Sequence, residues 1–279
     1  MTLSDTELDT LIQLITQRTG IIPRASHRDG IRSYIEKKLS ELGMDCASYK
    51  TLLLASHDVF AELVNESTVN ETYFFREERQ FAFIRDKLFP LWQAQFGSAP
   101  IKMWSAACSY GEEAYSLALL AKACHVRAEI IASDINTLVL EHCRKGEFLA
   151  SSMRHVDGAA FQHLLLPYRT QDGKVVFTAE LCNTITTRKI NLAAIDAPSM
   201  DTVLPQQQNI VFLRNVFIYF DQDLRARILR TIADKCLCTG GYLFVSMSEI
   251  AQLDASLMPK SFEKIVDGNV FYFHKKAED

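Results

Sequence analysis

Carboxylates that follow apolar segments are the first candidates for chemistry in this chain. Glu112 comes directly after Gly111, where an apolar run gives way to a helical segment rich in Ala and Leu. Asp134 ends the apolar run 129–133 and lies 23 residues beyond Gly111. In nucleotide-binding α/β proteins a glycine turn places ligand atoms against new helix N–H groups, and a carboxylate about 20 residues later takes the ribose hydroxyls. Capping of the next helix is the alternative explanation of Asp134.

A second candidate is the polar pair Arg214 and Asn215. The pair interrupts the apolar run 209–220 at the point where a central parallel strand is expected to end. Because buried polar groups need hydrogen-bonding partners, the pair favours a site at the end of this strand over a place in the core.

Five blocks of sequence follow one another in a characteristic order. They are 70–77 (NETYFFRE), 104–116 (WSAACSYGEEAYS), 132–135 (ASDI), 191–192 (NL) and 214–220 (RNVFIYF). In this order and at these spacings they resemble the chemotaxis receptor methyltransferases, the CheR family, over nearly the whole chain. The resemblance implies S-adenosylmethionine as the cofactor, with S-adenosylhomocysteine as its product. It also implies a protein-glutamate O-methyltransferase that acts on the cytoplasmic helical bundle of bacterial chemoreceptors during adaptation.

The family's functional positions can be carried over to matching residues. The resemblance implies cofactor contacts at Asn70, Thr72, Arg76, Glu112, Asp134, Asn191, Leu192, Asn215 and Val216. It implies catalytic roles beside the methyl group or the substrate carboxylate for Arg76 and Tyr219. Simpler explanations remain for some of them, since Asn70 and Thr72 would suit a helix cap and Tyr219 an ordinary buried aromatic.

Methyl transfer to a carboxylate is consistent with the absence of common catalytic residue sets from the sequence. We find no Ser-His-Asp set, no reactive-cysteine arrangement and no acids paired for proton transfer. A glutamate side chain, with a pKa near ~4.3, is already ionised and nucleophilic at neutral pH. Catalysis then needs positioning and a site with little water.

Two positions depart from the family pattern. Tyr110 stands where threonine is usual, and Ala114 stands where proline is usual. We expect the Tyr110 ring to narrow the pocket or to lie over the cofactor. A module that binds the cofactor without turnover, as a scaffold or sensor in a chemosensory-type signalling array, is therefore the alternative to an enzyme.

Basic residues near the N-terminus predict a surface for the receptor. They are Arg24, Arg28, Arg32, Lys37 and Lys38, against only Asp29 and Glu36 in the same span. Such a run is commonly a solvated helix face. Because receptor methylation helices are acidic, we favour a receptor-facing patch with salt-sensitive association.

Composition sets limits on the class of protein. A net charge of −4 suggests no nucleic acid partner. The start lacks a signal-peptide pattern, and no apolar run approaches the roughly 20 residues that span a bilayer. Scattered cysteines without C-x-x-C pairs, and histidines without ligand spacing, predict reduced thiols and no metal. We therefore expect a cytoplasmic monomer without direct membrane insertion.

Periodicity predicts the architecture. Apolar runs at 101–105, 129–133, 209–214 and 241–247 alternate with helical segments, and 262–274 forms a hairpin around Asp267-Gly268-Asn269. This alternation predicts an α/β, doubly wound sheet. Combined with the resemblance, it implies a Rossmann-like S-adenosylmethionine methyltransferase sheet with an antiparallel terminal hairpin.

The expected domains follow from the same patterns. We predict an all-helical receptor-facing domain at 1–80, a connecting helix and linker at 81–100, and a cofactor-binding methyltransferase domain at 101–279. Within the last, a small inserted antiparallel β-subdomain is expected at 167–190, from the β-prone runs 175–178 and 184–187. The short connection at 169–173 suggests a member that does not depend on a receptor tether peptide.

Overall fold

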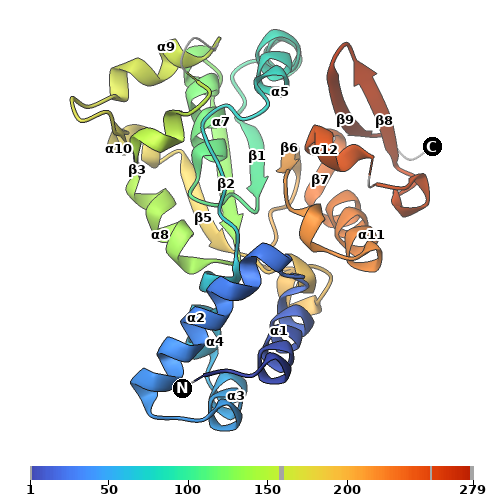
Figure 1. The fold of residues 1–279 in the computed structure, drawn as a ribbon. Coiled ribbons are helices and arrows are strands. Elements are labelled where there is room, and N and C mark those ends of the chain that lie inside the picture. The colour runs from blue at the N-terminus through green and yellow to red at the C-terminus, as the bar shows by residue number, and fades with distance from the viewer. Residues whose placement is uncertain (1, 157–159, 252, 277–279) are drawn as a thin grey trace.

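A β-sheet forms the centre of the carboxyl-terminal part of the chain (Figure 1). The computed structural model describes residues 2–156, 160–251 and 253–276, and within them the main sheet has seven strands in the order β5-β2-β1-β6-β7-β9-β8. The strands are β1 (Ile101–Ala106), β2 (Ala128–Asp134), β5 (Ile185–Lys189), β6 (Gln208–Leu213), β7 (Leu237–Phe244), β8 (Phe262–Asp267) and β9 (Val270–Lys275). Strands β5, β2, β1, β6 and β7 are parallel, and β9 is antiparallel to β7 and β8. The predicted doubly wound sheet with an antiparallel terminal hairpin is confirmed.

Helices cover both faces of this sheet. In β6, Ile210 and Phe212 belong to the core that includes α7 (Glu112–Ala123), whereas Val211 and Leu213 belong to the core that includes α11 (Gln222–Thr231). Both sets of side chains are buried. This is why the central strand appears in the sequence as a continuous apolar run instead of an alternating one.

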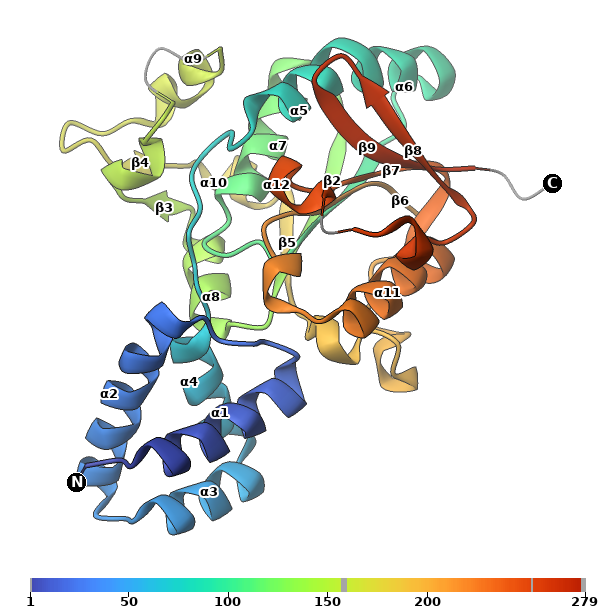
Figure 2. The same ribbon diagram turned by 45° about the vertical axis from the view of Figure 1, so that its right-hand side comes forward.

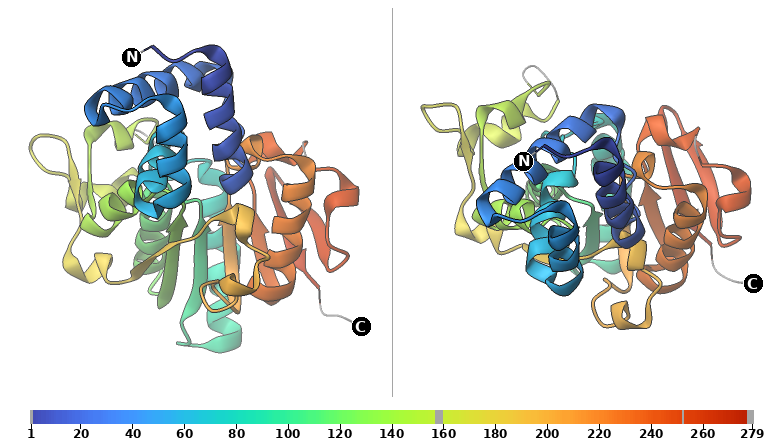
Figure 3. Two further views of the ribbon diagram at one scale, coloured as in Figure 1. Left: turned by 90° about the horizontal axis from the view of Figure 1, so that it is seen from below. Right: turned by 60° about the horizontal axis from the view of Figure 1, so that its bottom comes forward.

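The N-terminal residues form a helical unit with its own hydrophobic core. Its helices are α1 (Asp5–Thr19), α2 (Ala25–Leu42), α3 (Cys46–Ala55) and α4 (His57–Ser67). Asn65 of α4 holds the start of α8 (Thr137–Lys145), because its Oδ1 accepts from Thr137 N–H at 3.0 Å and its Nδ2 donates to Thr137 Oγ1 at 3.0 Å. The unit therefore lies at the edge of the sheet where the parallel strands end (Figures 2 and 3).

Residues 68–77 are not helical, although the sequence predicted helices up to residue 80. The segment is extended and then turns, with positive φ at Phe75 (+55°) and Glu77 (+59°). A right-handed α-helix requires negative φ at every residue, so these two residues cannot be part of one. The helix resumes at α5 (Glu78–Phe83), passes through a π-helical turn at Ile84–Leu88 and ends with α6 (Phe89–Phe96).

The inserted β-structure differs from its predicted form. Strand β3 (Glu147–Phe148) pairs with β4 (Val175–Val176) in an antiparallel ladder, with α9 (Gln162–Leu165) between them and α10 (Ala179–Cys182) after them. The predicted pairing of 175–178 with 184–187 is wrong, because Ile185–Lys189 is β5 and runs parallel to β2 in the main sheet. A β-prone run shows that a strand forms but does not show which neighbour it pairs with.

Two further findings concern the chain as a whole. The seven cysteines all lie in the described residues, and none of them is in a disulfide. Among the same residues, we find no helix with the length and apolar character that a membrane crossing requires.

Candidate active site

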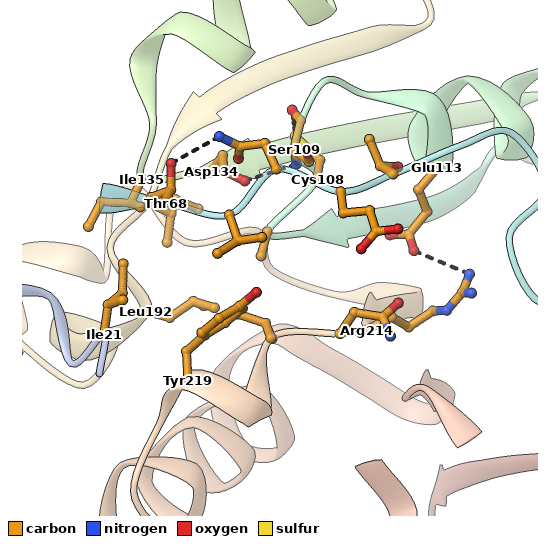
Figure 4. A pocket seen from close by; sticks show the side chains of 18 of the residues that line it. Ile21, Thr68, Cys108, Ser109, Glu113, Asp134, Ile135, Leu192, Arg214 and Tyr219 are labelled. Atoms are coloured by element: carbon orange, nitrogen blue, oxygen red, sulfur yellow. Dashed lines mark hydrogen bonds and ion pairs between the residues drawn. The ribbon is translucent and has the colours of Figure 1, made fainter. Parts of the chain in front are cut away.

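A cavity opens at the carboxyl ends of β1, β2 and β6, next to the N-terminal helical unit (Figure 4). It encloses about 980 Å³, including solvent-open space at its mouth, which lies in the range of small-molecule sites, ~300–1,000 Å³. Its walls come from the helical unit, from the segment 68–76, and from the loops that follow β1, β2, β5 and β6. Ligands of open α/β sheets bind at this edge.

The loop after β1 has a conformation that turns it tightly beside the cavity. Ala107, Ser109 and Gly111 all have positive φ, at +58°, +51° and +104°. A Cβ atom at Gly111 would lie 2.5 Å from Cys143 Sγ of α8, so the close approach of loop and helix requires glycine. Ser109 Oγ is buried beside the cavity and has no hydrogen-bond partner among the described residues.

Asp134 stands at the end of β2, and its side chain lines the cavity. Its Oδ2 accepts from Ser109 N–H and its Oδ1 from Asn136 N–H, both at 2.9 Å. Burial raises the pKa of this carboxyl, against the hydrogen bonds, which lower it. The alternative explanation as a helix cap does not apply, because the residue that caps α8 is Asn136. Just before Asp134, Ser133 Oγ accepts from the buried Trp104 indole at 2.9 Å.

Glu112, which the resemblance assigned to the cofactor, is not among the described residues that line the cavity. Its Oε1 instead accepts from Ser152 Oγ at 2.7 Å, beside the inserted β-structure. Glu113 lines the cavity, with Oε1 2.6 Å from Ser105 Oγ and Oε2 3.3 Å from Arg214 Nη1 (Figure 4). Successive side chains of an α-helix point about 100° apart, so these neighbours face different surroundings. Burial raises the pKa of both carboxyls.

Arg214 is a buried cation at the same end of the cavity as Glu113. Its side chain is 1% exposed and lies 3.8 Å from Glu77 Oε1, and its Nη2 donates to the backbone oxygen of Arg76. Its Nε has no hydrogen-bond partner among the described residues, and its Nη1 has only the ion pair with Glu113. A buried guanidinium with unused donors suits an anionic ligand group.

The segment before α5 brings Asn70, Thr72 and Arg76 to the cavity wall. No helix begins at Asn70 or Thr72, so the cap explanation does not account for them. Asn70 Nδ2 donates to Thr68 Oγ1 at 3.0 Å. Arg76 Nη1 donates to the Glu71 backbone oxygen at 2.8 Å, and the guanidinium lies over the Tyr73 ring, 5.6 Å from its centroid.

The remaining predicted contacts also line the cavity: Asn191, Leu192, Asn215, Val216 and Tyr219. Asn191 Nδ2 donates to the backbone oxygen of Arg18 at 2.8 Å, which ties the loop after β5 to the end of α1. Tyr219 is half-buried and lies across the cavity from the loop after β1 (Figure 4). Burial raises the pKa of its hydroxyl. The guanidinium of Arg24 lies 5.6 Å from the centroid of its ring.

Tyr110 is not among the described residues that line the cavity. Its ring packs edge-on against His142 of α8, with the centroids 5.0 Å apart. The expectation that this ring narrows the pocket or covers the cofactor is wrong. The left-handed turn at Ser109 directs the following side chain toward α8 and the protein surface.

The basic residues expected to face the receptor are mostly paired inside the helical unit. The pairs are Arg28 with Asp9, Arg32 with Asp5, Lys37 with Glu41, and Lys38 with Glu62. These acids lie outside the span in which the sequence showed an excess of positive charge. Arg24 differs, since no acid of the described residues lies within 4.0 Å of its guanidinium, and it stands beside Tyr219.

Several cavity residues are not among the predicted contacts. Thr19 and Ile21 reach the cavity from the end of α1, and no local pattern marks them. Arg214 was noticed as a polar residue in an apolar run but received no role. Glu113 could have been proposed from the sequence, because two adjacent glutamates occupy the first turn of one helix and either could face the cavity.

Comparisons with known proteins agree with this geometry. The family model described as "CheR methyltransferase, SAM binding domain" matches residues 70–265. The chemotaxis protein methyltransferase of Escherichia coli (strain K12) is 32% identical over 257 residues, covering 89% of this chain and 86% of that protein. The corresponding protein of Borreliella burgdorferi is 27% identical over 277 residues, covering 92% and 94%. The chain therefore belongs to the CheR family of chemotaxis methyltransferases and contains its S-adenosylmethionine-binding domain.

Proposed function

We propose that this protein transfers the methyl group of S-adenosylmethionine to glutamate side chains on the cytoplasmic helical bundle of bacterial chemoreceptors. The observation that carries the proposal is the cavity itself, which has Asp134 on one wall and the Glu113–Arg214 pair at one end. This distribution of charge matches a ligand with a ribose diol and a zwitterionic amino-acid end.

The residues present fit the cofactor group by group. Asp134 is an acceptor held at a strand end, which suits ribose hydroxyls. The partly buried Glu113 carboxylate suits an ammonium group, and the Arg214 guanidinium, whose Nε donates no hydrogen bond among the described residues, suits a carboxylate. The apolar side chains of Ile21, Ile135 and Leu192 gather in another part of the cavity (Figure 4) and suit a flat base.

In this reaction the protein has to position the cofactor and the substrate carboxylate. When bound, the cofactor supplies an electrophilic methyl group on a sulfonium. The receptor glutamate is ionised at neutral pH, so the protein need not remove a proton from it. Arg76 and Tyr219 both line the cavity. We assign them to hold one oxygen of the substrate carboxylate, by charge and by a hydrogen bond, which leaves the other oxygen for the attack. Tyr219 stays protonated, and so remains a donor, because burial raises its pKa.

The entrance of the cavity suits an acidic substrate. Guanidinium groups lie over Tyr219 and Tyr73, which line the cavity: Arg24 over Tyr219, and both Arg76 and Arg154 over Tyr73. We take this cluster as the entrance. These arginines come from the helical unit, the segment 68–76 and the inserted region. Glu71 partly offsets them by pairing with Arg154 at 3.3 Å. We infer that the entrance, more than the rest of α2, meets the acidic receptor helix.

The test is methyl transfer from labelled S-adenosylmethionine to receptor-containing membranes. We expect base-labile label on the receptor, as a glutamate methyl ester gives, and little or none with Tyr219→Phe combined with Arg76→Ala. Calorimetry with S-adenosylhomocysteine measures cofactor binding separately. If the protein binds the cofactor product but incorporates no label with any receptor tried, the enzyme proposal fails and the scaffold or sensor alternative takes its place.

A further inference from the structure

Glu249, on the short helix α12 (Met247–Ile250), is a buried carboxylate that does not line the cavity. Its Oε2 accepts from Asn215 N–H at 2.7 Å, and its Oε1 accepts from Phe217 N–H at 2.8 Å. Its Oε2 also accepts from Ser246 N–H at 3.3 Å. No lysine or arginine of the described residues forms an ion pair with it. Backbone N–H groups of Ser246 and of the loop after β6 are thus what stabilise the charge.

The loop that Glu249 holds is an irregular one that forms part of the cofactor wall. Asn215 has φ of +57°, a conformation that costs free energy in a non-glycine residue unless its surroundings impose it. Asn215 and Val216 line the cavity, and Tyr219 follows one turn later. Without the carboxylate, the N–H groups of Asn215 and Phe217 would lose the acceptors that fix this conformation.

Ser246 forms similar hydrogen bonds to a second segment of the cavity wall. Its Oγ accepts from Asn215 Nδ2 at 3.0 Å and donates to Glu77 Oε1 at 2.5 Å. Glu77, at φ +59°, also accepts from Met247 N–H at 3.2 Å. Glu77 directly follows Arg76, so the segment 246–249 connects the segment that carries Arg76 to the loop that carries Asn215.

A role in packing alone does not explain these polar groups. A buried carboxylate without a cationic partner is costly, and an apolar side chain of similar size would fill the same space at lower cost. A buried carboxylate is retained where its acceptor geometry is needed, for example to hold groups that contact a ligand.

We propose that Glu249 and Ser246 are positioning residues of the cofactor site, which act through the loop 214–217 and through Glu77 without touching the ligand. The proposal rests on the cofactor part of the proposed function. Its own test therefore includes a measurement on the ligand-free protein.

The chain offers a matched control. Ser4 and Glu7 form the same kind of capping box at the start of α1, where Ser4 N–H donates to Glu7 Oε2 at 2.9 Å. The replacements Glu249→Gln and Glu7→Gln make the same chemical change in the two boxes. At position 249, where both carboxylate oxygens accept from backbone N–H groups, a glutamine keeps one acceptor but turns an N–H donor toward a backbone N–H. Glu7 accepts through Oε2 alone, so its glutamine can keep the local cap.

The readouts are amide hydrogen exchange at Asn215 and Phe217 in the ligand-free protein, S-adenosylhomocysteine affinity by calorimetry, and the thermal midpoint. We expect Glu249→Gln to speed exchange at both amides and to weaken binding about tenfold or more, since a hydrogen bond to a charged group is lost. Glu7→Gln should leave amide exchange at Asn215 and Phe217 and the affinity unchanged, whatever it does to the thermal midpoint. Ser246→Ala removes only a hydroxyl and should weaken binding by about threefold or more while the amides stay protected by Glu249.

Each result decides the proposal. Unchanged exchange and unchanged affinity in Glu249→Gln would overturn it, as would equal losses in both glutamine variants. If Glu249→Gln does not fold, Ser246→Ala decides alone, and wild-type affinity in that variant rejects the proposal. Failure of the wild-type protein to bind S-adenosylhomocysteine would count against the proposed function instead, because the exchange measurement tests the positioning without ligand.

Discussion

Two adjacent glutamates at the start of α7 contact different parts of the protein. Glu113 faces the cavity beside Arg214, and Glu112 faces Ser152 of the inserted region. Glu112 is buried and Glu113 is partly buried, and their different partners give them different roles. Glu113 suits a positively charged ligand group, and Glu112 holds the inserted region against the methyltransferase sheet.

The pair of replacements Glu113→Gln and Glu112→Gln separates these tasks. We expect Glu113→Gln to weaken S-adenosylhomocysteine binding about 10- to 100-fold, or ~1.4–2.7 kcal/mol, because a charge-assisted hydrogen bond is lost. Glu112→Gln should change the affinity less than about twofold, since an amide can still accept from Ser152. Calorimetry measures both. Equal losses would show that the assignment of Glu113 over Glu112 is wrong.

Cofactor affinity should also depend on pH. Burial raises the pKa of Glu113 and of Asp134, so the free protein holds protons on these groups at a higher pH than ordinary carboxyls do. A bound ammonium group favours the ionised form of Glu113, so binding releases protons. Affinity is therefore full above the raised pKa values and falls as the pH drops through them. Glu113→Gln should flatten this fall, and an equally steep fall in that variant would contradict the explanation.

At this scale, the sequence predicted which strand ends border the cavity better than which side chain faces it. Asp134 was predictable because a strand end fixes its place. The choice between Glu112 and Glu113 was not, because α7 is buried on nearly every side. A helix without a polar face has no periodicity from which the direction of one side chain could be deduced.

Among the elements, the loop between β1 and α7 is the most constrained part of the site. Positive φ at Ala107, Ser109 and Gly111 lets the backbone turn within a few residues. At Gly111 the backbone also meets Cys143 of α8, so two constraints apply at one residue.

Replacement of Gly111 by alanine tests these constraints against a matched glycine. Gly268, in the β8–β9 turn, also has positive φ (+59°), but a Cβ atom there meets nothing within 4 Å. We expect Gly268→Ala to lower the free energy of unfolding by about 1 kcal/mol, from backbone strain alone. Gly111→Ala should cost about 2–4 kcal/mol, because a clash is added to the strain. Denaturant unfolding compares them, and equal costs would mean that Cys143 moves aside freely.

The positions of most strands and helices were predictable from periodicity, but their partners were not. The runs that became β1, β2 and β6 are apolar on both faces, which fixes them in the centre of a parallel sheet. The run that became β5 contains Thr186, Thr187, Arg188 and Lys189. This mixed pattern suits a small surface ladder as well as an edge strand of a large sheet, so the sequence left the pairing open.

In the molecule as a whole, the helical unit and the sheet share one cavity. Thr19 and Ile21 form part of its wall, and Asn191 holds the end of α1 through the backbone oxygen of Arg18. No sequence pattern reports a contact between segments so far apart in the chain. A ligand in the cavity should therefore couple two units that the sequence presents as separate.

This coupling is measurable by hydrogen exchange. Saturating S-adenosylhomocysteine should slow amide exchange in residues 19–21 as well as in the loop after β1, because ligand binding suppresses local opening on both walls. Helix α3 is the internal control, since it belongs to the helical unit but contributes nothing to the cavity among the described residues. Protection of the loop without protection of residues 19–21 would contradict a shared cavity.

Receptor recognition should depend on the cavity entrance more than on the length of α2. Arg24→Ala should raise the KM for receptor-containing membranes about 3- to 10-fold, with an effect that shrinks at high salt. S-adenosylhomocysteine affinity should stay within about twofold, because Arg24 is not part of the cavity wall. Lys37→Ala, which removes a charge already paired with Glu41, should leave the KM near wild type. A similar rise in KM for both variants would instead support a receptor surface that extends along α2.

The buried indole at the end of β1 gives the molecule a built-in optical reporter. The chain has two tryptophans. Trp92 is partly exposed on α6, and its Nε1 donates to the Ala99 backbone oxygen. Trp104 is fully buried and bonded to Ser133, the residue before Asp134. With Trp92 changed to phenylalanine, tryptophan fluorescence, excited where tyrosine does not absorb, would come from Trp104 alone. Its emission would therefore follow the filling of the cavity in real time without an added dye.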